Sequence, residues 1–294
     1  MSRARTVAVD PSFTVTQPIH CEVELVRATS DALFASGEPF DHFRGAHVDL
    51  AFIDGMHLFE FVLRDFINTE AHSAASTVVV LDDVFPRRLS EAARNRYTAD
   101  WTGDVYKIIP VLQRYRPDLC LVPVDTYPTG VLLILGLDPA NTVLSSNYEE
   151  IVKMFVVPDP QPVPEALLKR AFALSPEMVL AAPFWAQILA TRTTEAPALS
   201  KELADEVRSI FALDSRGSMA DWLPESGGVK EPFREGMTRR VLCSRGVRAA
   251  VRNPLLQKLA VGLIKHFRDG CGSPAATAYP SLRPTGTNAT ASRL

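Results

Sequence analysis

The sequence has 294 residues, of which 47% are hydrophobic, and its formal net charge is -3 at pH 7. This composition supplies enough apolar surface for one sizeable core. The small net charge excludes a chain-wide basic surface for nucleic acid, as well as an acidic disordered chain. The cysteines lie far apart and form no Cys-x-x-Cys pair, so neither a zinc site nor a disulfide framework is predicted; they are Cys21, Cys120, Cys243 and Cys271.

Export and membrane signals are not visible in the sequence. The N-terminus MSRARTVAVD has basic residues but no long apolar run behind them. No stretch approaches the ~20 apolar residues of a membrane span. Together with the scattered cysteines, this pattern predicts a soluble protein of the reducing cytoplasm without a transmembrane segment.

Short runs rich in Val, Ile and Leu alternate with stretches of helical period. This alternation is typical of an α/β domain with a mostly parallel sheet and helices on both faces. Apolar stripes predict helices at about residues 57–70, 104–115 and 148–155. Six strands are predicted, at residues 6–10, 21–28, 48–54, 76–83, 119–125 and 130–137.

The composition changes in the later part of the chain. Prolines cluster in residues 158–164 and predict a linker that ends an α/β domain of residues 1–157. Residues 165–215 have helical periodicity and predict a small helical region. From 216 to 294, 13 Lys and Arg stand against 5 Asp and Glu, a balance of +8 against -11 for the residues before them. This basic tail is predicted to be largely disordered, except for a helix at 255–267 that either packs on the protein or lies on an anionic membrane.

Carboxylates follow three of the predicted strands. Asp10 ends the first strand, Asp54 ends the third, and the fourth ends in Asp82 and Asp83. Because the carboxyl ends of parallel strands share one edge of a sheet, where ligands of open α/β sheets bind, we expect the four acids around one crevice. For each acid taken alone, the alternative is a cap on the helix that follows.

Polar turns after the first two predicted strands suit a nucleoside. Asp10 is followed by Pro-Ser-Phe rather than by helix-forming sequence, and its two oxygens match the vicinal hydroxyls of a ribose. The later turn Thr29-Ser30-Asp31 offers a carboxylate that could accept from an adenine amino group. The alternative for this turn is an N-cap for a helix that begins at Ala32.

The ends of the third and fourth predicted strands suit a divalent cation. Asp54, Asp82 and Asp83 supply three carboxylates, which with water and substrate oxygens would complete an octahedron around Mg²⁺ or another hard ion. The alternative is that the Arg-Arg pair following closely relieves their repulsion. His57 has a side chain suited to taking a proton from a hydroxyl, although a histidine at a helix start also serves as a cap or packing residue.

Three segments carry a family resemblance, FIDGMHLFEFVLRDF, VVVLDDVFP and WTGDVYKIIPVLQRYRPDL, preceded by VAVDPSF and TSD. Over residues 5 to about 155, this ordered set resembles the class I S-adenosylmethionine-dependent methyltransferases grouped around macrocin-type O-methyltransferases. The resemblance implies a Rossmann-like fold and S-adenosylmethionine as the methyl donor. It also implies residue roles: ribose binding by Asp10, adenine-side contacts by Ser30 and Asp31, cation ligation by Asp54, Asp82 and Asp83, further catalytic and cofactor-side roles for Asp54, and His57 facing the substrate. Trp101, Gly103, Asp104 and Lys107 belong to the same pattern.

One part of the family's pattern is not found. Such enzymes begin with a strand that ends in an acid and a glycine-rich turn of the E-x-G-x-x-x-G kind, whose backbone closely approaches the methionine part of the cofactor. Here the first predicted strand already matches the second strand of the pattern, so we expect a domain that lacks the first strand and its loop and is truncated at its N-terminus. In the family's strand order the missing strand is central, so its neighbours are expected to be unpaired or to close up differently.

Together with the predicted cation site, the resemblance implies divalent-metal-assisted O-methylation of a small-molecule hydroxyl, of the sugar or natural-product type. No nucleic-acid partner is expected, and a homo-oligomer is compatible with these features. One alternative is a metal-dependent glycosyltransferase, because an acid pair after a strand can also hold Mg²⁺ against a nucleotide-sugar diphosphate. Another is an inactive methyltransferase-like binding module, favoured by the absent glycine loop and the basic tail. A NAD-dependent oxidoreductase is disfavoured, since no G-x-G-x-x-G follows a predicted strand.

Overall fold

The computed structural model describes residues 4–19, 22–36, 38–194, 198–199 and 201–211. The predicted basic tail and its helix at 255–267 lie outside the described residues. In the part of the chain that is described, none of the helices has the length and apolar character needed to cross a membrane.

All six predicted strands are present, but they form two sheets. One sheet has two strands, and the other has four in the order β3-β4-β6-β5. β2 runs parallel to β1 and β4 parallel to β3, whereas β6 is antiparallel to both of its neighbours, so β3, β4 and β5 share one direction. The strands are β1 (Arg5–Val9), β2 (Glu22–Val26), β3 (Val48–Ile53), β4 (Ser73–Asp82), β5 (Cys120–Val124) and β6 (Val131–Leu135).

The three predicted helices of the α/β domain are confirmed, and the C-terminal helical region is present as several short helices. The predicted helix at 57–70 begins two residues late, and the one at 104–115 begins with a 3-10 turn. The helices and 3-10 turns (η) are α1 (Ser30–Ser36), η1 (Glu38–Phe43), α2 (Phe59–Glu70), η2 (Val105–Lys107), α3 (Ile108–Tyr115), α4 (Val143–Ser146), α5 (Tyr148–Phe155), α6 (Glu165–Leu168), α7 (Pro176–Leu180), α8 (Phe184–Thr194) and α9 (Lys201–Phe211).

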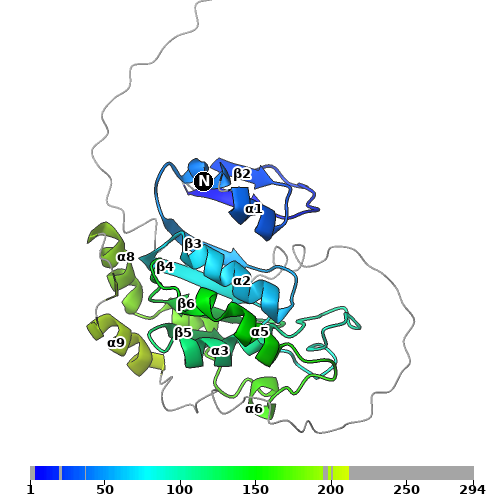
Figure 1. Cartoon of the computed structure of the whole chain (residues 1–294). Helices are drawn as coiled ribbons and strands as arrows, with labels where there is room; N and C mark the ends of the chain where they lie inside the picture. The colour runs from blue at the N-terminus through cyan, green and yellow to red at the C-terminus, as the bar shows by residue number, and fades with distance from the viewer. Residues whose placement is uncertain (1–3, 20–21, 37, 195–197, 200, 212–294) are drawn as a thin grey trace, which may run out of the picture.

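The division into two sheets corrects the expectation of a single sheet with all four acids at one edge. Among the described residues, β1 pairs only with β2, and β3 pairs only with β4. Within the described part of the chain, the outer edges of β1 and β3 therefore carry backbone groups without a strand partner. Figure 1 shows β1, β2 and α1 as a unit apart from the four-stranded sheet. This unit contacts α2 through α1, where Arg64 donates to both carboxylate oxygens of Asp31 at 2.6 Å.

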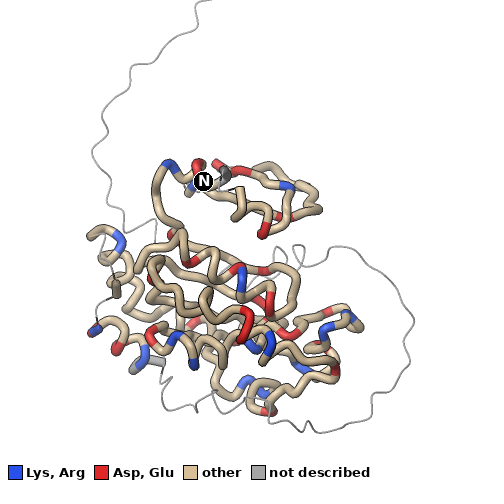
Figure 2. The backbone as a smooth tube through the Cα atoms, in the orientation of Figure 1, with Lys and Arg blue, Asp and Glu red and all other residues tan. Residues whose placement is uncertain are grey.

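Two apolar layers cover the four-stranded sheet because successive side chains of each strand point to opposite faces. In β4, Val79 and Leu81 pack with α2, α3 and α5 on one face, while Val78 and Val80 pack on the other. Trp185 of α8 and residues of α7 and α9 line that second face, so the helical region after the proline segment completes a helix-sheet-helix arrangement. Acidic and basic residues are interspersed along the described chain (Figure 2).

Gly130, just before β6, offers a test of this packing. It has φ +66°, and a Cβ there would lie 2.0 Å from Cδ2 of the fully buried Phe85 ring. We expect Gly130→Ala to lower the free energy of unfolding by about 3 kcal/mol, from left-handed strain and overpacking combined. Urea unfolding followed by tryptophan fluorescence measures the change.

The matched control is Gly136→Ala, at the other end of β6. Gly136 has φ +84°, but its nearest neighbours would lie 3.6 Å or more from a Cβ, which is ordinary contact. The free energy of unfolding of this variant should fall by only about 1 kcal/mol, which is the strain of a left-handed backbone at alanine. An equal decrease in the free energy of unfolding of the two variants would contradict the close contact between Gly130 and the Phe85 ring.

Candidate functional site

The carboxyl ends of β3 and β4 carry the candidate site. The parallel register pairs Ile53 with Leu81, so Asp54, which directly follows β3, and Asp82, the last residue of β4, lie at the same level. Asp83 follows directly, and its φ of 61° lies in the left-handed region. His57 has a φ of 55° as well. A residue other than glycine adopts this conformation at a cost of about 1 to 2 kcal/mol, and such strain concentrates at functional sites.

The side chains of Asp54, His57 and Asp83 meet at this edge. Nε2 of His57 lies 3.0 Å from Oδ1 of Asp54, and its Nδ1 lies 3.0 Å from Oδ2 of Asp83. One potential ligand atom from each of the three residues lies within 4.8 Å of the others. The three side chains are only 11 to 14% exposed. Two carboxylates and an imidazole at this spacing form a donor set that suits a divalent cation.

Asp82 adjoins this group in a different orientation. Its Oδ1 accepts from the backbone N–H of Asp83 at 2.9 Å, and the residue is 9% exposed. Asp82 therefore lies beside the three residues that come together, rather than among them.

The charges of this cluster act strongly on one another. Burial disfavours the charged form of His57, but the carboxylates of Asp83 and Asp54 outweigh it and hold the pKa of His57 well above its ordinary value. Burial, together with the charges of Asp83 and Asp54, raises the pKa of Asp82 well above its ordinary value. The shift of His57 reflects the two carboxylates beside it, whereas that of Asp82 reflects first its burial and then the neighbouring negative charges, which a bound cation would offset.

The alternative in which the Arg-Arg pair neutralises these acids is not supported. Arg87 and Arg88 both bind Glu91, and Arg87 also binds Asp100. Among the ion pairs of the described residues, the cationic partner of Asp54 and Asp83 is His57.

A turn at residues 101–104 supports His57. The Trp101 ring stacks on the imidazole, with centroids 5.3 Å apart and planes 18° apart. The backbone carbonyl of Trp101 lies 2.7 Å from Nδ1 of His57. Gly103 has φ +56°, and a Cβ there would lie 1.7 Å from the carbonyl oxygen of His57. Only glycine allows this approach of the two backbones.

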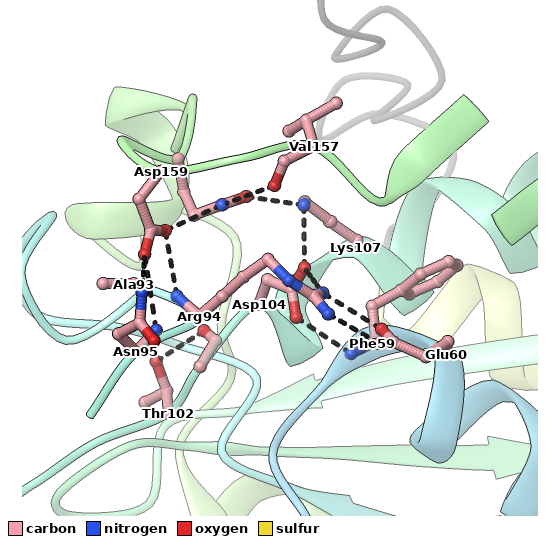
Figure 3. Close-up of polar contacts among 12 residues, drawn as sticks. Phe59, Glu60, Ala93, Arg94, Asn95, Thr102, Asp104, Lys107, Val157 and Asp159 are labelled. Carbon is pink, nitrogen blue, oxygen red and sulfur yellow. Dashed lines mark hydrogen bonds and ion pairs between the residues drawn. The ribbon is translucent and has the colours of Figure 1, made fainter. Parts of the chain in front are cut away.

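Asp104 connects the same turn to α2. Its fully buried carboxylate accepts from the backbone N–H of Phe59 at 2.9 Å, from Arg94 at 2.7 Å and from Lys107 at 2.8 Å (Figure 3). Phe59 begins α2 two residues after His57. The network therefore holds the segment that carries the imidazole from its C-terminal side. The sequence indicated Asp104 and Lys107 only through the resemblance.

Arg94 was not found by sequence analysis. It also binds Glu60 at 2.5 Å (Figure 3), 34 residues earlier in the chain. A lone arginine and a lone glutamate so far apart carry no sequence signal of their pairing.

The residues predicted to bind the cofactor's nucleoside lie in the N-terminal unit. Asp10 follows β1, and its Oδ1 accepts from the backbone N–H of Ser12 at 2.5 Å. Ser30 hydrogen-bonds to Asp65, and Asp31 binds Arg64, so both residues connect α1 to α2. The cofactor roles of Asp10, Ser30 and Asp31 remain predictions.

Comparison with known proteins relates part of the chain to a protein family. A family model described as a methyltransferase domain matches residues 3–84 of the 294. Neither the curated proteins nor the solved structures gave a match. The matched stretch contains every predicted site residue and supports a methyltransferase domain, within an α/β fold that has parallel strands and helices on both faces.

Asp82→Asn tests the excess charge in the metal-free protein. Because the pKa of Asp82 is raised in the folded state, its ionisation costs stability as pH rises above the unfolded value of about 3.9 and through the folded value. The amide removes this cost and can keep the bond from the Asp83 N–H. We expect a gain of about 1 kcal/mol at pH 8, and a smaller gain near pH 4.5, from urea unfolding with EDTA.

The control for this prediction is Asp41→Asn, which changes an exposed carboxylate of η1. It should leave stability within about 0.5 kcal/mol at both pH values. A loss of stability in Asp82→Asn at pH 8 would contradict the charge excess.

Proposed function

We propose that this protein is an S-adenosylmethionine-dependent methyltransferase that methylates a hydroxyl oxygen of a small molecule, with a divalent cation at the carboxyl ends of β3 and β4. One observation carries the proposal: Asp54, His57 and Asp83 converge there, inside the stretch that matches a methyltransferase domain. The α/β architecture is consistent with it, since open α/β sheets bind ligands beyond the carboxyl ends of their strands.

The residues of the cluster fit a divalent cation. Three carboxylates stand beside one imidazole in a largely buried setting, and burying such a charge excess is costly unless a cation compensates it. Asp54 and Asp83 would hold the ion, with Asp82 as the third ligand that the resemblance implies. When bound, such an ion polarises a hydroxyl and lowers its pKa.

The chain's own residues would orient the acceptor and receive its proton. His57, or a carboxylate of the cluster, would accept the proton of the acceptor hydroxyl. The contacts of His57 with Trp101 and Asp83 would hold its side chain in place before any substrate binds. Much of the rate would come from alignment of the attacking oxygen with the methyl group that S-adenosylmethionine supplies.

The fit to S-adenosylmethionine is partial. Asp10, Ser30 and Asp31 offer oxygens for a ribose and an adenine, but no E-x-G-x-x-x-G turn follows any strand in the described part of the chain to approach the methionine part. Binding of this cofactor therefore needs its own test, separate from turnover.

Loss of the acids should abolish methyl transfer. We expect Asp54→Ala and Asp82→Ala each to lower the metal-dependent rate by at least about a hundredfold, because each removes a charge next to the reacting hydroxyl. Transfer of a labelled methyl group to a panel of sugar and phenolic acceptors measures the rate. Asp138→Ala, on the loop after β6, is the control and should retain activity. Full activity in either site variant would refute the cation assignment.

A metal-dependent glycosyltransferase is the second candidate, favoured by the adjacent carboxylates Asp82 and Asp83 at the end of β4. Calorimetric titration with S-adenosylmethionine and with a nucleotide sugar, each with Mg²⁺, separates the two candidates. We expect heat of binding with S-adenosylmethionine and none with the nucleotide sugar. The reverse result would replace the proposal, and cofactor binding without any turnover would favour the non-catalytic binding module.

A further inference from the structure

We propose that His57, through Nε2, is the third ligand of the cation site beside Asp54 and Asp83, and that the site therefore takes a transition-metal ion such as Mn²⁺ in preference to Mg²⁺. The inference rests on the cation site of the proposed function, but it does not depend on methyl transfer. It differs from the ligand set that the family resemblance implies, in which Asp82 is the third ligand. With Nε2 on the ion and a hydrogen on Nδ1, His57 has no free lone pair, so of the two bases offered under the proposed function a carboxylate of the cluster would accept the proton of the acceptor hydroxyl.

The Trp101 carbonyl determines which nitrogen of His57 carries a hydrogen. A carbonyl oxygen only accepts, so the 2.7 Å contact requires an N–H at Nδ1, which Oδ2 of Asp83 shares at 3.0 Å. In the metal-free protein, a second hydrogen on Nε2 is donated to Oδ1 of Asp54 at 3.0 Å, and a bound metal ion would take the place of this hydrogen and accept the lone pair of Nε2. Two electron-rich atoms at this distance repel unless a proton or a metal ion lies between them. A ring N–H donated to a backbone carbonyl is also the usual support of a histidine that binds metal.

Asp82 is placed less favourably for this role. Its Oδ1 already accepts from the N–H of Asp83, and it lies outside the group whose potential ligand atoms are within 4.8 Å of one another. It contributes negative charge next to the site, and this charge would strengthen binding of any cation.

The site is built to keep His57 in this orientation. The Trp101 ring stacks on the imidazole, and Gly103 allows the two backbones to touch. Asp104 holds the start of α2 directly after the His57 segment. A ligand fixed in this way loses little conformational freedom when an ion binds.

The donor set decides which ion is preferred. Mg²⁺ demands oxygen ligands in near-ideal octahedral geometry and usually keeps several waters. An imidazole nitrogen with two carboxylates suits first-row transition ions, which accept nitrogen and oxygen together. Replacing one carboxylate of the expected set by His57 therefore shifts the preference away from Mg²⁺.

Titration of the full chain with MnCl₂ and with MgCl₂, without cofactor or acceptor, tests the proposal. The wild type should bind Mn²⁺ at least about tenfold more tightly than Mg²⁺, and His57→Gln should lose about tenfold in Mn²⁺ affinity and most of the preference. Asp82→Asn should weaken the binding of both ions to a similar extent, because it removes a nearby buried charge, and should therefore keep the preference for Mn²⁺. Asp41→Asn, at an exposed position of η1, is the control and should change neither affinity by more than about threefold. Circular dichroism checks that each variant is folded.

A second measurement does not depend on how the variants fold. Pulsed electron paramagnetic resonance of bound Mn²⁺ detects coupling to a ligating nitrogen, which we expect in the wild type and not in His57→Gln. Bound Mn²⁺ without nitrogen coupling in the wild type would overturn the inference.

Two outcomes separate this inference from the proposed function. If Asp54→Asn and Asp83→Asn lose Mn²⁺ while His57→Gln retains both affinity and preference, His57 is not a ligand and only this inference fails. If the wild type binds neither ion, or if neither aspartate variant changes binding, the cation site itself fails and the proposed function fails with it.

Discussion

The parallel pairing of β3 with β4 is the constraint on which the site depends. With Ile53 opposite Leu81, the acid that follows β3, Asp54, lies at the same level as the acid that ends β4, Asp82. Parallel strands can bring two carboxylates together in this way because they run in one direction and end at the same edge. A register shift of one residue would turn the apolar side chains of β4 to the wrong faces, so the same hydrophobic packing that stabilises the sheet also places Asp54 beside Asp82.

Holding these acids together is unfavourable for folding, and contacts in the surrounding structure offset this unfavourable free energy. His57 and Asp83 occupy strained backbone conformations, and the carboxylates repel one another. Compensation comes from the Trp101 carbonyl, which contacts the imidazole of His57, and from the buried Asp104 network, which binds Phe59 at the start of α2 (Figure 3 shows the Asp104 network). The strain and repulsion lower the stability of the fold, and such features are typical of sites that bind a ligand.

Much of the fold could be predicted from the sequence because its signals are local. The apolar runs of β4, β5 and β6 are buried over nearly their whole length. The acids at the carboxyl ends of β3 and β4 were visible in the sequence because they interrupt runs of apolar residues. The pattern of residues 148–155 predicted α5 with its correct ends, because the apolar stripe begins and ends at the same residues as the helix.

The remaining features depend on contacts between distant residues. Pairing at the outer edges of β1 and β3 is decided by neighbours in space, so the division into two sheets has no local signal. The contact between His57 and Trp101 spans 44 residues, and the bond between Phe59 and Asp104 spans 45. The orientation that separates Asp82 from Asp83 follows from a left-handed backbone at one residue, which the residue type Asp does not by itself predict.

Anomalous diffraction at the manganese edge, from crystals of the full chain grown with MnCl₂, tests the central claim most directly. The account predicts a single strong peak between the side chains of Asp54, His57 and Asp83. A peak at another place, or well-ordered side chains at these three residues with no peak between them, would contradict it.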